Sequence, residues 1–272
     1  MATIVEGDMY YKLDGQLLEI KRQLRQSGGY PFDPSELSHG LQEIIEGRFG
    51  GHARIQSLVD TSSVAPPPVP RPHIEILRER PKPCAERKTD ELVADMKEMY
   101  RQLEWTFTES GLAIPERRKG LDRLLVIGST LTNNKGFEAN EASYPSWRYN
   151  DDLDIAVPTN ERYPSKDGAY AIWVRDSQEP DEKLLNLSAN MIAAKNPKIK
   201  TITLLEREVH ELVHVMETGR HLDQESVTLC LGSRCSGGFV PNARWRGGRF
   251  RVCWDAPDDW DPILGVREVV SL

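Results

Sequence analysis

The sequence predicts an α+β fold, because helical and strand-like patterns occupy separate parts of the chain. Apolar residues recur at helical spacing over residues 89–111, 181–195 and 201–219, whereas the last forty residues alternate with the two-residue period of strands. A proline-rich stretch over residues 64–83 precedes these segments. We therefore expect an N-terminal α+β module at 1–63, a linker at 64–88 and a main domain at 89–272.

The N-terminal module is expected to contain a hairpin followed by a helix. Asp14-Gly15 lies inside the segment 10–18, between pairs of apolar and polar residues, which is a strong hairpin signal. Asp33 can cap a helix that has Pro34 at its first position and Glu36 three residues after the cap. In the linker, proline removes backbone donors and favours an extended chain, so we expect neither regular helix nor sheet there.

The main domain is expected to begin with a helix from Thr89 to Gly111, with Thr89 as its cap. Leu124–Ile127 reads as a short strand that ends at Gly128-Ser129, and an irregular polar stretch follows it. Two more helices are predicted at Asp181–Lys195 and Thr201–Gly219, the second closed by Gly219.

Composition narrows the functional classes. The net charge of -7 argues against a protein that coats nucleic acid by charge alone, although it leaves room for a local basic patch. No apolar run is long enough for a bilayer, and the N-terminus lacks the order of a secretory signal, which predicts a cytoplasmic protein. The four cysteines are then expected to be free thiols; they are Cys84, Cys230, Cys235 and Cys253.

One motif would suit a zinc peptidase. His210-Glu211-Leu212-Val213-His214 fits HExxH, in which two histidines one helical turn apart bind zinc and the glutamate acts as general base. Glu217 and Arg220 stand where the longer metzincin pattern needs a glycine and a third histidine. The alternative interpretation is a helix surface with two solvated histidines.

A second motif would suit a nucleotidyltransferase. In those enzymes Gly-Ser opens a helix over the triphosphate, and two carboxylates on a strand hold magnesium. Gly128-Ser129 and Asp152-Leu153-Asp154 have the required residue types, but the stretch between them is long and no third carboxylate is placed. The alternative is a turn glycine with solvated loop aspartates.

A third cluster could bind calcium. Asp255, Asp258, Asp259 and Asp261 lie within seven residues but lack the EF-hand spacing. An exposed acidic loop is favoured, because aspartates beside Pro257 and Pro262 are common in turns.

The C-terminal segment has the most regular alternation in the chain. Before Gly247-Gly248, Ala243 and Trp245 alternate with polar residues, and after it Phe250, Val252 and Trp254 do the same. Because successive side chains of a strand point to opposite faces, this pattern predicts a hairpin with aromatic residues inward and arginines outward.

This segment resembles the variable proteins of diversity-generating retroelements, which have a C-type lectin-like fold of the formylglycine-generating-enzyme type. The resemblance rests on GSRCSGGFVP, the W-RGG-RFRVCW hairpin and GVREVVS, and more loosely on Gly168 onward through TLLERE and ETGRHLD. It is strong over about the last 100 residues. It implies a ligand-binding protein, not an enzyme, with a variable region at about 232–265. The EPN, QPD and WND loops of calcium-dependent lectins do not occur here, so sugar binding through calcium is not implied.

In that family reverse transcription randomises template adenines, so positions with Asn codons vary and codons without adenine stay fixed. Such variation cannot yield Lys, Glu, Gln, Met or Trp, and neither Glu nor Lys occurs between Gly232 and Arg267. The resemblance and the outward pattern together give these candidate contacts: Cys235, Ser236, Gly237, Asn242, Arg244, Arg246, Arg249, Arg251, Cys253, Asp255, Asp258, Asp259, Asp261 and Ile263. The expected scaffold residues are Gly232, Ser233, Trp245, Phe250, Trp254 and Arg267.

We expect no catalytic residue, metal or cofactor. The ligand is expected to be a macromolecule, with protein favoured and nucleic acid left open, because arginine suits bidentate contacts to carboxylates or phosphates. The rivals are the two enzymes above and an assembly protein whose arginine face packs on another subunit. Without the resemblance, a half-buried hairpin with a solvated charged face would be an equal alternative.

Overall fold

The computed structural model describes residues 72–78 and 81–272, and Arg71–Leu272 form one compact unit. The expected hairpin at 10–18, the expected helix after Asp33 and the linker up to residue 71 lie outside the described residues. Within residues 72–78 and 81–83 the backbone forms neither helix nor strand.

The described part is α+β, as predicted, with six α-helices and three sheets. The helices are α4 (Thr89–Gln102), α5 (Asn133–Ser143), α6 (Leu153–Ala156), α7 (Pro164–Asp167), α8 (Ala189–Lys195) and α9 (Leu204–Thr218), with short 3₁₀ turns at Cys84–Glu86 and Glu182–Leu184. The strands are β1 (Arg123–Ile127), β2 (Ser146–Arg148), β3 (Thr159–Asn160), β4 (Tyr170–Val174), β5 (Val227–Leu229), β6 (Ser233–Arg234), β7 (Val240–Arg246), β8 (Arg249–Asp255), β9 (Leu264–Gly265) and β10 (Val269–Val270).

The largest sheet has the order β2-β8-β7-β5-β9 and carries the C-terminal hairpin. β7 and β8 are antiparallel, whereas β2 pairs with β8 and β9 pairs with β5 in parallel. A second sheet, β1-β4-β10, is antiparallel and joins the first described strand to the last one. A third, two-stranded sheet pairs β3 with β6.

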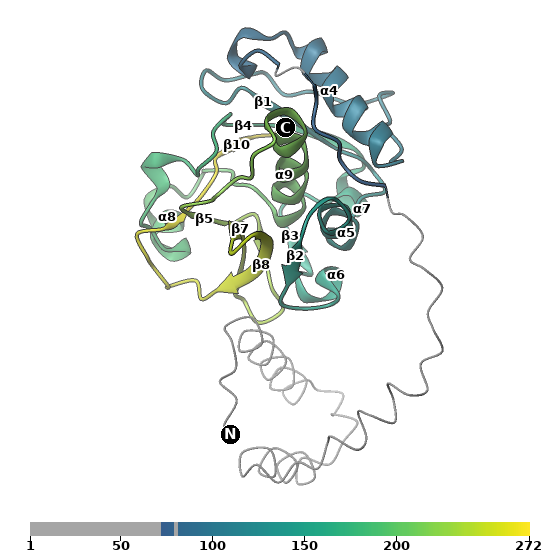
Figure 1. The fold of residues 1–272 in the computed structure, drawn as a ribbon. Coiled ribbons are helices and arrows are strands. Elements are labelled where there is room, and N and C mark those ends of the chain that lie inside the picture. Colours follow the sequence, from purple (N-terminus) through teal and green to yellow (C-terminus); the bar gives the residue numbers. More distant parts are fainter. Residues whose placement is uncertain (1–71, 79–80) are drawn as a thin grey trace, which may run out of the picture. The chain divides into compact units, whose positions relative to one another are not determined.

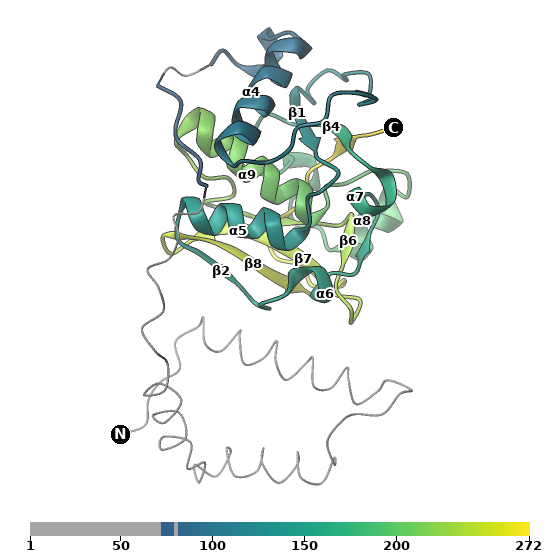
Figure 2. The same ribbon diagram turned by 90° about the vertical axis from the view of Figure 1, so that its right-hand side faces the viewer.

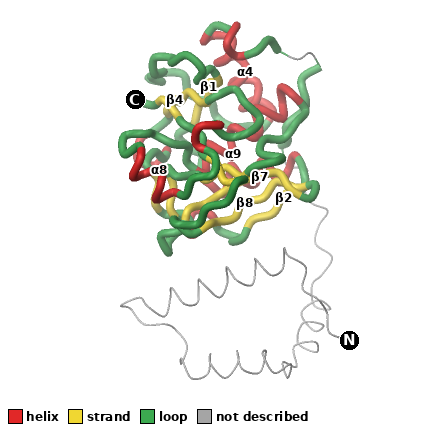
Figure 3. Tube along the Cα trace, turned by 90° about the vertical axis from the view of Figure 1, so that its left-hand side faces the viewer, coloured by secondary structure: helices red, strands yellow, loops and turns green. Residues whose placement is uncertain are grey.

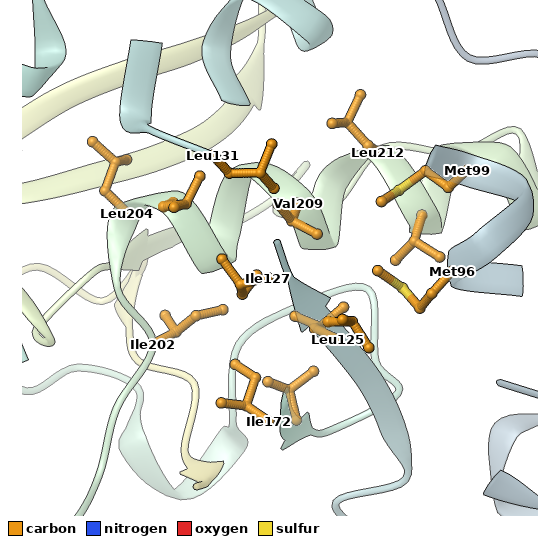
Figure 4. Packing of buried hydrophobic residues seen from close by; sticks show 14 of the residues in the cluster. Met96, Met99, Leu125, Ile127, Leu131, Ile172, Ile202, Leu204, Val209 and Leu212 are labelled. Carbon is orange, nitrogen blue, oxygen red and sulfur yellow. The ribbon is translucent and has the colours of Figure 1, made fainter. Parts of the chain in front are cut away.

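Helix α9 occupies the centre of the described part (Figure 1), and every residue from Leu204 to Glu217 is buried. After a quarter turn, α9 and α5 are seen between α4 and the sheet that holds β2, β8 and β7 (Figure 2). Around α9, the side chains of α4, β1 and β4 form the main hydrophobic core (Figure 4). A smaller second cluster combines residues of α8, β5, β7 and β9.

Helix α9 lies within its predicted range of Thr201–Gly219 but begins three residues later than predicted, at Leu204. Thr203 caps it by accepting a hydrogen bond from the Glu206 backbone, and the Glu206 carboxylate in turn accepts from the Thr203 backbone at 2.8 Å. Gly219 ends the helix in the left-handed region, as expected for a C-cap glycine.

Three predicted elements differ from the structure. Helix α4 ends at Gln102 instead of Gly111, because the chain reverses at Glu104 and brings Trp105 and Phe107 edge-on against Tyr100 of the helix. The helix expected at 181–195 is two short pieces, and Ser188 caps the second of them. The irregular middle contains α5, although loops connect many of the elements (Figure 3).

The predicted cap of α4 is wrong, because Lys88 is its N-cap and Thr89 is its first residue, whereas the predicted strand and the free cysteines are confirmed. The strand expected at Leu124–Ile127 is β1, whose five residues are all buried. All four cysteines are free thiols. No helix among the described residues has the length and apolar character required to cross a bilayer.

Candidate ligand-binding face

The hairpin β7–β8 has the predicted two-sided pattern. Its register pairs Arg244 with Arg251 and Arg246 with Arg249, so these four side chains share one side of the ribbon. We call them the arginine face. Gly247 and Gly248 both have positive φ angles, which the two-residue turn of such a hairpin requires.

The opposite side of the hairpin faces the main core. Ala243, Phe250 and Val252 are fully buried, and Trp245 and Trp254 are half-buried against the same core. The ring of Trp254 packs on Phe239 with centroids 4.4 Å apart. All the expected scaffold residues are therefore buried or half-buried.

Aromatic stacking and hydrogen bonds between charged groups connect the turn end of the hairpin to α9. Trp245 stacks flat on His221, with ring centroids 3.3 Å apart. His221 Nδ1 lies 2.9 Å from a carboxylate oxygen of Glu211, and Arg207 donates to the other oxygen at 2.7 Å. The Tyr144 ring contacts both stacked rings edge-on. The orientation of Trp245 is thus fixed from below the ribbon.

Asp223 is the centre of the buried charge network that continues from Arg207. Its carboxylate accepts hydrogen bonds from Arg207 at 2.9 Å, Arg267 at 2.5 Å and Thr228 at 2.6 Å. Its backbone carbonyl accepts from the Trp245 backbone at 3.1 Å. Although burial opposes ionisation, the two guanidinium groups lower the pKa of Asp223 below its ordinary value. Asp223 therefore stabilises the hairpin through backbone and side chain.

The far end of the ribbon is covered on both sides. Val240 and Asn242 lie on the arginine side, but Val240 belongs to the second hydrophobic cluster with Ala189 and Ile192 of α8. Asn242 is buried and donates to Asp255 at 2.7 Å. The open part of the face is consequently the turn end.

The charges of the arginine face repel one another. Burial lowers the pKa of Arg244, and the positive charges of Arg246 and Arg251 lower it further. The guanidinium of Arg251 also lies over the Trp147 ring of β2, 5.9 Å from its centroid. Cys253, on the same side, has a pKa raised to about 11 by burial, so it remains a thiol.

The remaining candidate positions lie in two loops. Ser236 and Gly237 are exposed, but Cys235 is buried and accepts a hydrogen bond from the Tyr149 hydroxyl at 3.3 Å. Cys235 and Asn242 thus differ from the expectation that they face outward. After β8, Asp258, Asp259 and Asp261 are exposed, and so is Ile263. We call residues 256–263 the acidic loop.

Two scaffold residues lie where backbone segments approach closely. A Cβ on Gly232 would come within 2.8 Å of the Thr201 carbonyl oxygen and 3.1 Å of that of Ile202. Beside it, the Ser233 hydroxyl accepts from the Leu204 backbone at 2.9 Å. The segment that enters the hairpin is thus packed directly on the start of α9.

Replacing Gly232 with alanine is expected to lower the free energy of unfolding by about 1–3 kcal/mol, because backbone carbonyls cannot move aside as a side chain can. Urea denaturation of the purified chain measures this change. Ser236→Ala, in the exposed part of the same loop, should change the value by less than about 0.5 kcal/mol. Equal unfolding midpoints for both variants would contradict the close approach.

The HExxH segment lies on α9, and its surroundings match neither a zinc site nor a solvated helix surface. His210 and His214 are buried, not solvated, because the whole of α9 is enclosed. None of their four ring nitrogens has a hydrogen-bond partner, and Glu211 is held by Arg207 and His221. Among residues 72–78 and 81–272, no group of three His, Cys, Asp or Glu side chains could hold a metal ion.

The Gly-Ser and Asp-Leu-Asp motifs also serve local structure. Ser129 lies in an exposed turn, and α5 begins only at Asn133. Asp152 caps α6 by accepting from the Ile155 backbone at 3.1 Å, so the two aspartates flank the start of a helix and not a strand. Asp154 accepts from the Tyr163 hydroxyl at 2.8 Å. These bonds fix loop geometry.

Sequence reasoning missed the residues that orient the hairpin from beneath. His221, Glu211, Arg207 and Asp223 come from α9 and from the loop after it, and no local pattern indicates that they meet Trp245. It also missed Trp260, which is 65% exposed in the acidic loop. A signal was present for Trp260, since a tryptophan between aspartates is unusual in a solvated turn.

Comparison with protein-family models, with curated proteins and with solved structures finds no match to this chain.

Proposed function

We propose that this chain is a ligand-binding protein whose C-terminal hairpin displays residues diversified by a retroelement on a C-type lectin-like scaffold. The observation that carries the proposal is the side-by-side position of four arginines on one side of β7–β8, above a core that fixes the other side. A preorganised sheet with exchangeable outward groups is suited to recognising different ligands.

The arrangement of fixed and exchangeable positions supports this function. Phe250 and Val252 are fully buried, whereas their neighbours Arg249 and Arg251 are only half-buried. The ring of Trp245 is oriented by His221, which lies in the loop after α9 and is not part of the hairpin. Changes on the arginine face therefore leave the packing below it intact.

The expected ligand is a macromolecule with anionic groups. Arginine pairs with carboxylates through two parallel hydrogen bonds, and burial raises the strength of such contacts. A protein surface with Asp and Glu side chains fits best, because a nucleic acid has a higher density of negative charge and is repelled more strongly by the chain's overall charge of -7. The face is not proposed to bind a metal or a cofactor.

The exchangeability of the face can be tested by substitution. The double variant Arg244→Asn, Arg246→Asn is expected to keep the free energy of unfolding within about 1 kcal/mol of the original chain. Phe250→Asn, on the core side of the same hairpin, should cost more than about 3 kcal/mol. If the two variants unfold at similar urea concentrations, the outward residues matter to stability as much as the core residues do, and the arginine face is not exchangeable.

The genetic part of the proposal has a separate test. The DNA that encodes the chain should be followed by a near-copy of its 3′ end that differs at adenines, beside a reverse-transcriptase gene. Flanking DNA without such a repeat would overturn the proposed diversification. The substitutions described above would then be the remaining test of the binding face.

A further inference from the structure

The arginine face and the acidic loop lie at opposite ends of strand β8. The strand runs from Arg249, next to the Gly247-Gly248 turn, to Asp255, and the acidic loop follows directly. At about 3.3 Å per residue, the two ends of β8 are separated by roughly 20 Å. The ribbon therefore has a positive end and a negative end.

Both charged regions belong to the same side of the ribbon. Val240 shares the side of Arg244 and Arg246, and it packs in the second cluster with Ala189 and Ile192 of α8. The backbone N–H of Asn190, also in α8, donates to the Pro257 carbonyl at 2.9 Å. The acidic loop is thus attached to α8, the helix that packs in the same cluster as Val240 on the arginine side.

The acidic loop presents apolar groups together with its charges. Trp260 is 65% exposed, Ile263 is 37% exposed, and Met191 of the attached helix is 40% exposed. An indole ring is the best aromatic partner for a guanidinium group, which stacks on its face. The loop therefore offers the two contacts that arginine prefers, carboxylate and indole.

The backbone of the acidic loop is held in place. Asp259 accepts from the Ala256 backbone at 2.9 Å, and the Asp261 carbonyl accepts from Leu264 at 2.9 Å. The Ile263 carbonyl accepts from Val227 at 2.8 Å, which joins the loop to β5. A loop with a fixed backbone loses little conformational entropy when it binds.

We propose that the chain forms a two-fold symmetric homodimer in which the acidic loop of each copy lies on the arginine face of the other. A two-fold axis that lies in the interface, above the middle of the ribbon and perpendicular to its strands, places the positive end of one copy opposite the negative end of its partner, so both contacts form at once. A second copy is the occupant whose charges match the face and whose indole can stack on its guanidinium groups. The dimer uses Arg246 and Asp258, which are also proposed ligand-contact positions, so it is a property of this particular sequence and the second copy would compete with the ligand.

The test is the mass of the full chain in solution, measured by sedimentation at micromolar concentrations in low and high salt. The expected result is a dimer at low salt that dissociates as salt rises, because exposed ion pairs are screened. Arg246→Glu and Asp258→Arg should each weaken self-association at least about tenfold, because each places like charges opposite one another. Trp260→Ala should weaken it by a similar factor.

A mixing experiment then separates this dimer from any other. The Arg246→Glu and Asp258→Arg variants repel their own copies, but when mixed they should form a heterodimer, because both contacts regain opposite charges. Glu116→Arg and Lys119→Glu reverse exposed charges in the segment before β1 and serve as controls that leave the dimer unchanged.

Three results would overturn the proposal. They are a single-chain mass at low salt, a dimer that both charge reversals leave intact, and a mixture of the two variants that stays monomeric. None of these results bears on diversification, which the flanking DNA tests. A monomer that binds an acidic protein through the arginine face would support the proposed function while removing the dimer.

Discussion

Replacing Asp223 with alanine is expected to lower the free energy of unfolding by about 3–5 kcal/mol. Asp223 lies between the buried guanidinium groups of Arg207 and Arg267, and its removal leaves both positive charges without their shared carboxylate. Two buried charges of the same sign then repel each other in a region that water does not reach. Chemical denaturation, followed by far-UV circular dichroism, measures the loss.

The same variant should also loosen the hairpin. The backbone of Asp223 accepts from Trp245, so local rearrangement of the loop releases the turn end of β7. Hydrogen exchange of the amides in β7 and β8 is therefore expected to accelerate more than that of α4. Asp258→Ala, which removes an exposed carboxylate, is the matched control and should change stability by less than about 0.5 kcal/mol. A loss for Asp223→Ala no larger than for this control would contradict the role of the network.

Acidification is expected to destabilise the fold through His210 and His214. Burial lowers the pKa of both imidazoles, that of His214 to about 4. In the unfolded chain they take up protons near pH 6.5, while the folded chain does not, so unfolding binds protons and becomes easier as the pH falls below about 6.5. For His214 alone, the change between pH 7.5 and pH 5 amounts to about 2 kcal/mol.

The measurement is the free energy of unfolding at pH 7.5 and at pH 5, for the original chain and for His214→Leu. Burial raises the pKa of Asp95 to about 6, so this carboxyl makes the fold more stable as the pH falls, which opposes the effect of the histidines. Only the comparison between the two chains isolates the contribution of His214. The variant should lose about 2 kcal/mol less on acidification. Equal losses in both chains would show that His214 is protonated in the folded state.

The burial of charged residues on α9 explains why the histidines could not be placed from the sequence. Charged residues are interspersed among the apolar residues of the helix, a pattern typical of a helix with one face in water. They include Glu206, Arg207, Glu208 and Glu211. In the structure these charges are enclosed, and most of them are paired: Glu206 with Arg162, Arg207 with Asp223, and Glu217 with Arg123. The partners come from distant segments, which a local pattern does not reveal.

Glu208 is an exception within that helix. Both of its carboxyl oxygens are buried without a hydrogen-bond partner, and burial raises its pKa well above the ordinary value, so it is held as a neutral acid. A Cβ on Gly136 would overlap one of these oxygens, because α5 packs closely on α9 there. Glu208 contributes volume rather than charge to the core.

The sequence by itself determined the local elements whose signal is carried by neighbouring residues. The hairpin, its glycine turn and its two sides follow from alternation, because side chains of a strand must point to opposite faces whatever surrounds them. The end of α9 follows from Gly219 for the same local reason, because glycine readily adopts the left-handed conformation that closes a helix.

Only the tertiary structure decided which side of each element meets water. Asn242 is buried on the side that alternation had assigned to solvent, and α9 is buried along its length despite its charges. The orientation of Trp245 likewise depends on His221, which is brought to it by the fold. Whether a residue is buried depends on the segments that pack against it. Hydrogen bonds and ion pairs to distant residues reduce the cost of burying a charge, so a short stretch of sequence does not show which charged residues are buried.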